Sequence, residues 1–208
     1  MSQINVNKVY SPTQAGIDGP PVEIASNGNI SIDTDTVFVD STNDRVGIGT
    51  NSPARTLDIQ QLGGIAFNSG LIFEDCQLTG SGLSGTSHHS VEADNARYWN
   101  GAASGNWTYN IRYNSSTTLD SKMSNGETIN VSYITAVGGS SYYQTGFQID
   151  GSSKTVQWIR NQPPIQAGGG ESGDDVANQG FDVYSFAINK YGSNAFYILG
   201  AHTHFGAY

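Results

Sequence analysis

Hydrophobic and polar residues alternate along the carboxy-terminal half of the chain, which is the pattern of β-strands with one buried face. Ile129, Val131 and Tyr133 point to one face of an extended segment, while their polar neighbours point to the other. Short strands at this spacing, without helical periodicity between them, predict an antiparallel β-sandwich, similar to a jelly roll, over residues 106–208. Turn sequences rich in glycine follow at residues 138–140, 150–152, 168–170 and 191–193.

Residues 1–60 contain shorter β-like segments, each ended by glycine, proline, asparagine or aspartate. Residues 34–39 and 45–50 flank the sequence Asp-Ser-Thr-Asn-Asp. The side chains of such a sequence can satisfy backbone groups, so we expect a hairpin turn there.

The sequence Val46, Gly47, Ile48 and Gly49 places two branched apolar residues on one face of a strand and two glycines on the other. A strand face without side chains permits close approach by a second backbone. Chains wound about a common axis need such an approach. We therefore expect this segment to be part of a homo-oligomeric β shaft, in which β-chains of several copies intertwine.

Residues 61–105 are the least regular stretch and predict a Gly/Ser-rich connector that joins two modules or wraps a neighbouring chain. Within it, residues 71–73 fit one buried strand and residues 90–99 fit a single helical turn. Residues 80–85 match the phosphate-binding pattern G-x-G-x-x-G. That motif needs a helix directly after it, and none is predicted, so we interpret the glycines as part of the connector.

Composition limits the fold class to all-β. Glycine, serine, asparagine and threonine together make up 84 of the 208 residues, and only 13% of residues are charged. Serine, threonine and asparagine side chains compete with the helix backbone for hydrogen bonds, so a long helical bundle is excluded. The single cysteine, Cys76, cannot close a disulfide within the chain and predicts a buried structural thiol.

The net charge is −9, and no basic run is present, which argues against nucleic acid as a partner. No apolar run approaches the ~20 residues that span a bilayer, so we expect no membrane insertion. The first residues also lack the charged and apolar segments of a signal peptide. This pattern predicts a protein made in the cytoplasm and used without secretion.

Two parts of the sequence resemble virion proteins of tailed bacteriophages. Asn-Asp-Arg-Val-Gly-Ile-Gly-Thr at residues 43–50, with Leu-Asp-Ile at 57–59, resembles a segment of phage tail fibres. Residues 147–158 and 181–200 look like the terminal β-sandwich of virion structural proteins. The resemblance implies a fibre-like trimer in which residues 1–60 form a short shaft that trimerises and docks on the tail, baseplate or capsid. The carboxy-terminal domain then faces outward. With one shaft motif, the chain suits a short fibre or spike.

His202 and His204 are the leading metal candidates. Residues two apart on a strand face the same side, so three chains meeting on an axis would present six imidazoles to one ion. The resemblance implies the same arrangement, because fibre tips of tailed phages hold iron through such pairs. The alternative is a polar carboxy-terminal tail with solvated histidines. Apart from this ion on the trimer axis, the sequence predicts no cofactor.

Tyr142, Tyr143 and Tyr191 are aromatic residues near predicted turns, where their rings could stack on sugars, although core packing is the alternative for each. Asp174 and Asp175 lie in a Gly-rich loop and are candidates for a glycan or calcium contact. Glycan cleavage needs two carboxyl groups at a fixed separation, which such a loop does not provide. We therefore expect contact with a glycan, or solvated loop acids, rather than catalysis.

Together these patterns predict a non-enzymatic virion structural protein. It would be a homotrimeric tail-fibre or spike subunit that docks on other virion proteins and displays its β-sandwich toward host cell-surface glycans. The alternatives are a capsid decoration, cement or head-fibre protein, a polysaccharide depolymerase, and a carbohydrate-binding adhesin outside any virus.

Overall fold

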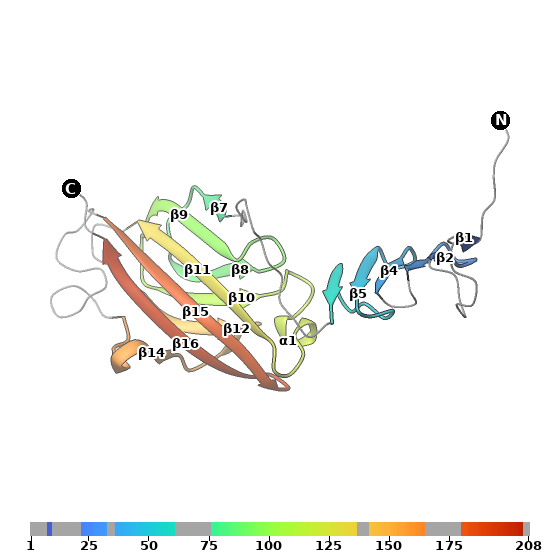
Figure 1. Cartoon of the computed structure of the whole chain (residues 1–208). Coiled ribbons are helices and arrows are strands. Elements are labelled where there is room, and N and C mark those ends of the chain that lie inside the picture. Colours follow the sequence, from blue (N-terminus) through green and yellow to red (C-terminus); the bar gives the residue numbers. More distant parts are fainter. Residues whose placement is uncertain are drawn as a thin grey trace. The chain divides into compact units, whose positions relative to one another are not determined.

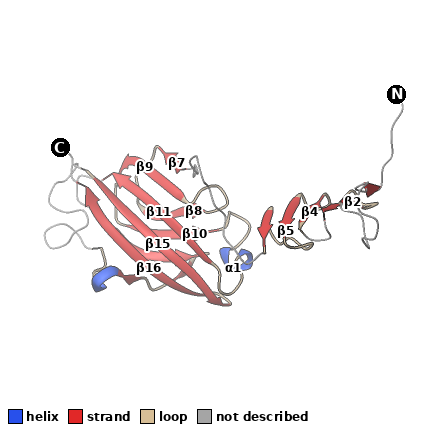
Figure 2. Ribbon diagram, in the orientation of Figure 1, coloured by secondary structure: helices blue, strands red, loops and turns tan. Residues whose placement is uncertain are grey.

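A computed structural model of the protein describes residues 8–9, 22–32, 36–60, 76–136, 142–164 and 180–205. The chain divides into two compact units, Met1–Leu71 and Ile72–Tyr208. The described residues are mostly strand, as predicted (Figures 1 and 2). Their helical content is the short helix α1 (Leu119–Lys122) and the 3-10 turn Ile159–Asn161. No described helix has the length and apolar character needed to span a membrane.

The first unit contains one six-stranded sheet whose strands follow their order in the sequence. Neighbouring strands are antiparallel except for the last pair, which is parallel. The predicted hairpin turn is confirmed, because the Asp40 carboxylate accepts hydrogen bonds from the side chain and backbone of Asn43 and from the backbone N–H of Thr42. The strands are β1 (Lys8–Val9), β2 (Val22–Ile24), β3 (Ile30–Ile32), β4 (Val37–Asp40), β5 (Arg45–Ile48) and β6 (Leu57–Ile59).

The register of this sheet gathers its aliphatic residues on one side. Paired residues on neighbouring strands share a face, and two such rows cross the sheet. The opposite face carries Ser31, Phe38, Gly47 and Asp58. We call the first side the aliphatic face; it consists of Ile32, Val37, Ile48 and Ile59 in one row and Ile24, Ile30, Val39, Val46 and Leu57 in the other.

The second unit contains a four-stranded sheet, in the order β13-β12-β10-β8, and a six-stranded sheet, in the order β14-β16-β15-β11-β9-β7. Their strands are β7 (Cys76–Thr79), β8 (Gly85–Ser90), β9 (Ala96–Ala102), β10 (Trp107–Arg112), β11 (Thr128–Ala136), β12 (Gln144–Ile149), β13 (Ser152–Ser153), β14 (Gln157–Trp158), β15 (Phe181–Gly192) and β16 (Ala195–Phe205).

The prediction of an antiparallel, jelly-roll-like sheet arrangement is wrong. Strand β10 is parallel to both β8 and β12, and β9 is parallel to both β7 and β11. From β7 to β12, successive strands belong alternately to the six-stranded and the four-stranded sheet. The chain therefore returns to each sheet after one intervening strand, and the new strand is parallel to the previous strand of that sheet.

The prediction of a connector over residues 61–105 is also wrong for the residues that the structure describes there. Strands β7, β8 and β9 occupy most of residues 76–102, and residues 91–93 form a turn in place of the expected helical turn. In the glycine-rich stretch, a Cβ atom on Gly82 would lie 1.8 Å from the Ala102 carbonyl oxygen. Gly82 thus permits a close approach to the end of β9, and Leu83 beside it is fully buried. Residues 71–73 lie outside the described residues.

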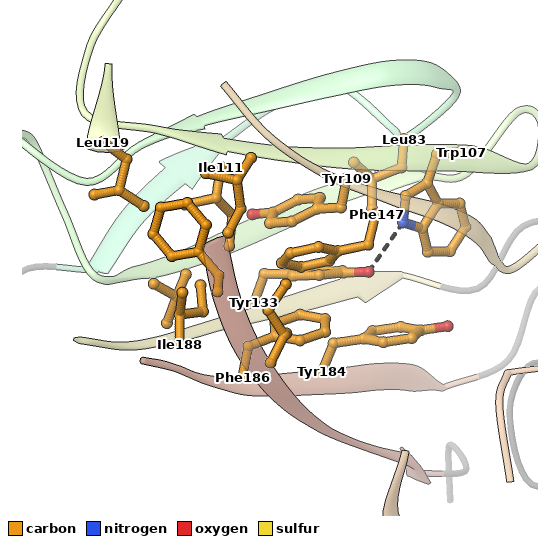
Figure 3. Close-up of a cluster of buried hydrophobic side chains, with 14 of the residues drawn as sticks. Leu83, Trp107, Tyr109, Ile111, Leu119, Tyr133, Phe147, Tyr184, Phe186 and Ile188 are labelled. Atoms are coloured by element: carbon orange, nitrogen blue, oxygen red, sulfur yellow. Dashed lines mark hydrogen bonds between the residues drawn. The ribbon is translucent and has the colours of Figure 1, made fainter. Parts of the chain in front are cut away.

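Both sheets of the second unit contribute to one hydrophobic core. The rings of Tyr109, Tyr133 and Tyr184 are stacked across it, with centroids 4.0 and 4.7 Å apart. Tyr133 accepts a hydrogen bond from the Trp107 indole at 2.9 Å (Figure 3). Its hydroxyl donates to Gln144 at 2.6 Å. A buried hydroxyl needs such partners, so this part of the core has one arrangement that satisfies its polar atoms.

Candidate functional site

The predicted shaft residues find partners within their own chain. A Cβ atom on Gly47 would lie 2.2 Å from the Thr50 carbonyl oxygen. Gly49 has a φ of 73°, which disfavours other residues. Both glycines are therefore required by the fold of one chain, and they no longer indicate approach by a second one. Val46 and Ile48 belong to the aliphatic face.

None of the nine side chains of the aliphatic face is buried in the single chain; five are half-buried and four are exposed. Ile24 and Ile32 are each 40% exposed, Ile59 is 39% exposed and Leu57 is 56% exposed. The buried residues among those described in the first unit are Gly47, Thr50 and Pro53, and none of them belongs to this face. Contiguous apolar surface of this kind marks a site of association.

His202 and His204 lie inside strand β16 rather than in a solvated tail, so the tail alternative is wrong. Both face inward, as their spacing predicts. The His204 Nδ1 atom is 2.9 Å from the Asp182 carboxylate, and the His202 Nε2 atom is 3.2 Å from the Gln162 carbonyl oxygen. Each imidazole thus uses one ring nitrogen within its own chain. Among the described residues, no group of three or more His, Cys, Asp or Glu side chains could hold a metal ion, and an ion shared by three chains stays a prediction.

The predicted glycan residues are not gathered in one place. Tyr142 packs against the hydrophobic core. Tyr143 lines a depression of about 450 Å³ together with Lys154. Tyr191 is 54% exposed and packs on Tyr197, with ring centroids 4.4 Å apart. Asp174 and Asp175 lie outside the described residues. Cys76 is exposed, so the prediction of a buried thiol is wrong.

A depression of about 640 Å³ crosses the outer face of the six-stranded sheet. The strand register aligns Ser132 of β11, Ser185 of β15 and Ala201 of β16, and these small side chains form a shallow floor. Leu199 and Ile159 at its side are 61% and 58% exposed. None of the described residues that line this groove is charged. It can therefore contact an uncharged partner through amide, hydroxyl and aliphatic groups.

A second, more polar pocket of about 330 Å³ lies over the outer face of the four-stranded sheet. Sequence reasoning missed it, because its lining comes from four separate segments. These are β8, β10, the loop at residues 114–118 and the turn at 150–151. Its lining residues are His88, Asn110, Arg112, Asn114, Ser115, Ser116, Thr117, Thr118, Asp150 and Gly151.

Behind that sheet, His89 belongs to a closed polar cluster in the core. Its Nε2 atom lies 3.0 Å from the Asp94 carbonyl oxygen and 2.7 Å from the Asp94 carboxylate, and its Nδ1 atom lies 2.9 Å from the Tyr109 hydroxyl. Asp94 offers only acceptors there, so Nε2 carries the proton and Tyr109 donates to Nδ1. Arg97 donates to the other Asp94 oxygen at 2.7 Å. His89 and Tyr109 have no exposed surface, so this constellation is structural.

Acid is expected to weaken the second unit through His89. Burial, and then the charge of Arg97, lower the pKa of His89 from its ordinary value of 6.5, against the attraction of Asp94. Below pH 6.5 the unfolded chain therefore binds a proton that the folded chain does not. The free energy of unfolding then falls by up to about 1.4 kcal/mol per pH unit until the folded pKa is reached. Urea unfolding between about pH 7.5 and about pH 5 measures this slope.

The variant His89→Gln should lose that slope, because it has no proton to take up. His88→Gln is the matched control, since His88 is mostly exposed, and it should keep most of the slope. Equal slopes in the wild type and in His89→Gln would contradict the assignment.

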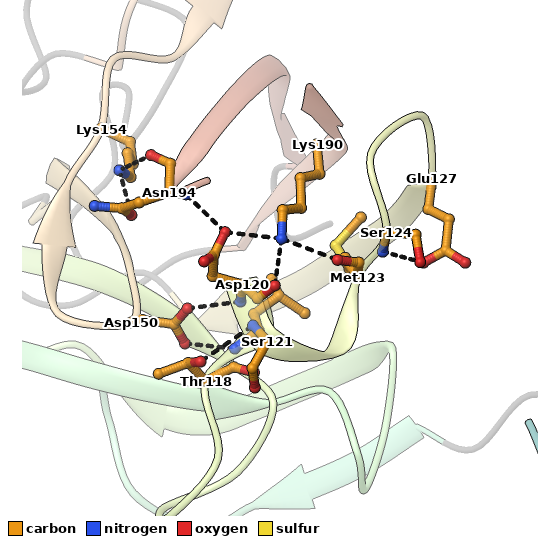
Figure 4. A network of polar contacts seen from close by, with 11 residues as sticks. Thr118, Asp120, Ser121, Met123, Ser124, Glu127, Asp150, Lys154, Lys190 and Asn194 are labelled. Carbon is orange, nitrogen blue, oxygen red and sulfur yellow. Dashed lines mark hydrogen bonds and ion pairs between the residues drawn. The ribbon is translucent and has the colours of Figure 1, made fainter. Parts of the chain in front are cut away.

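Lys190 of β15 holds the short helix α1 in place. Its ammonium group donates to the carbonyl oxygens of Asp120 and Met123 and lies 3.0 Å from the Asp120 carboxylate (Figure 4). Hydrogen bonding to Lys190 lowers the pKa of Asp120. Asp120 also accepts from the backbone N–H of Asn194 at 2.7 Å, so the network joins α1 to the turn between β15 and β16.

No protein-family model, curated protein or solved structure matches the chain. A function for the protein then rests on its own geometry. The aliphatic face of the first unit and the surface depressions of the second unit are the features that remain unexplained by folding alone.

Proposed function

We propose that the protein is a virion structural protein without enzymatic activity, a homotrimeric tail-fibre or spike subunit of a tailed phage. Residues 1–60 form the shaft that docks on the particle, and the second unit is a β-sandwich displayed toward host-surface glycans. The observation that carries the proposal is the aliphatic face, none of whose side chains is buried in the single chain.

The shape of this face favours three copies. The strands β2 to β6 that form this face are three or four residues long, so the face is about 10–13 Å wide along the strands. Each strand contributes at most two side chains to it. Three such narrow sheets can close into a triangular prism in which each of the two rows contacts a different neighbour. Ser31 and Asp58 on the opposite face would then meet water. Burial of the aliphatic rows supplies the association energy at about 25 cal/mol per Å² of apolar surface.

The second unit supports a display role because it has a complete core of its own. Its uncharged groove offers amide and hydroxyl groups for the hydroxyls of a sugar, and the exposed pair Tyr191 and Tyr197 offers rings for stacking. This surface does not depend on the shaft for its stability.

Light scattering on the purified full chain tests the trimer, for which we expect three times the protomer mass of 22.1 kDa. A folded monomer that persists at micromolar concentration would overturn the proposal. Antibody labelling of phage particles tests the location, with label expected on the tail. Label on the capsid would replace the fibre role with that of a decoration or head-fibre protein.

A further inference from the structure

The polar pocket of the four-stranded sheet is lined by polar side chains, two of which, His88 and Arg112, keep N–H groups without a described acceptor. His88 of β8 pairs with Asn110 of β10, and Ser90 pairs with Arg112 two residues further along. The loop at residues 114–118 and the turn at Asp150–Gly151 enclose the space above these strands.

The floor of the pocket fixes the proton of His88. Asn110 is 3% exposed, and the Oδ1 atom of its side-chain amide accepts a hydrogen bond from the Gly151 N–H at 2.9 Å. Its amide nitrogen must therefore be the donor to His88 Nδ1, at 2.8 Å. The neutral imidazole then carries its proton on Nε2, where no described residue accepts it. Burial and the charge of Arg112 lower the pKa of His88, which keeps this neutral form at pH 7.

Arg112 supplies the charge. Its Nε–H donates to the Ser90 hydroxyl at 3.4 Å, and none of the described carboxylates forms an ion pair with it. Its terminal N–H groups form a planar fork that matches a carboxylate.

The carboxylates of Asp150, which lines the pocket, and of Glu92 already accept hydrogen bonds from the protein. The two oxygens of Asp150 accept the backbone N–H groups of Leu119 at 2.7 Å and Asp120 at 2.9 Å. Glu92 accepts from the Asn114 amide at 2.9 Å. Neither carboxylate accepts a hydrogen bond from His88 or Arg112, so the His88 Nε2–H and the terminal N–H groups of Arg112 keep no described acceptor.

We infer that this pocket binds the carboxylate of an acidic sugar, with the Arg112 guanidinium and the His88 Nε2–H as donors. The hydroxyls of Ser115 and Thr117 have no described partner and can bond the sugar hydroxyls. A volume of about 330 Å³ accommodates one sugar ring, so the ligand is the end or branch of a glycan. The inference extends the proposed function, on which it depends only for the place where such a glycan is met.

Titration calorimetry of the full chain tests it with glucuronate, galacturonate and N-acetylneuraminate as probes and glucose as the uncharged control. We expect at least one acidic sugar to bind and glucose not to bind. Arg112→Gln should weaken that binding at least tenfold, because it removes a charge-assisted bidentate contact. His88→Gln should weaken it severalfold. Arg160→Gln, which removes an exposed arginine outside the pocket, should leave it unchanged.

The outcomes separate this inference from the proposed function. A trimer that binds none of the acidic sugars overturns the inference and leaves the fibre proposal standing. A monomer that binds an acidic sugar overturns the fibre proposal and leaves the inference standing. Equal losses of affinity in Arg112→Gln and Arg160→Gln would show that binding comes from general charge attraction, and would overturn the inference. Tighter binding of glucose 6-phosphate than of any carboxylate would assign the pocket to phosphate and overturn the carboxylate claim.

Discussion

Replacing Lys190 by methionine is expected to destabilise the second unit by about 3–5 kcal/mol, the range for breaking a buried ion pair. Methionine keeps the length of the side chain but removes the ammonium group, which leaves the carbonyl oxygens of Asp120 and Met123 without their donor. Each buried acceptor left unpaired costs about 1–3 kcal/mol. Lys190 is 7% exposed, so water does not easily replace the lost contacts. Urea unfolding followed by tryptophan fluorescence measures the change.

Lys154→Met is the matched control, because it removes the same charge from the same network. Lys154 bonds the carbonyl and side-chain oxygens of Asn194 at the surface, at 2.8 Å each. An exposed contact of this kind contributes about 1 kcal/mol or less. Similar losses in the two variants would show that Lys190 does not support α1 in the way described.

Replacing Ile48 by aspartate is expected to convert the proposed trimer to monomer at micromolar concentration. Ile48 lies on a central strand of the aliphatic face, so closing the prism would bury a carboxylate without a partner, at a cost of several kcal/mol. Light scattering measures the mass. Near-UV circular dichroism should stay unchanged, because the aromatic core lies in the second unit.

Ser31→Asp adds the same charge to the opposite face of the same sheet and should leave the trimer intact. If both variants dissociate, general charge repulsion explains the result. If neither does, the aliphatic face is not the contact between copies.

The sequence predicted β11 because Ile129, Val131 and Tyr133 alternate with polar residues. It indicated β15 and β16 by their density of aromatic and branched residues, since apolar side chains fall on both faces of these strands and only their burial alternates. It did not predict β8, because the inward residues of that strand are Ser87 and His89, and a strand without apolar side chains shows no hydrophobic period. The pattern also reports which side chains are buried but not which sheet a strand joins. The parallel pairing therefore could not be foreseen.

Two residues that are adjacent in sequence, His88 and His89, belong to two different sites. His88 and His89 point to opposite faces of β8, as neighbouring strand residues do. One therefore lines a surface pocket while the other lies in the core. Their partners, such as Arg112 and Asp150, come from distant segments that only the fold brings together. Gly47 shows the converse: its lack of a side chain was foreseen to matter, but the atom that requires it is the Thr50 carbonyl oxygen of the same chain.

The alternation of strands β7 to β12 between two sheets also affects how the second unit folds. Neither sheet can be assembled from a continuous piece of chain, and β12 reaches its place beside β10 only after β11 has been laid in the other layer. Folding therefore requires many contacts between residues far apart in sequence, and loop closure must precede the contacts that repay it. During synthesis from the amino terminus, both sheets of the second unit would stay incomplete until β12 and the later strands have been made. Fragments that end before β12 are expected to be insoluble rather than partly folded.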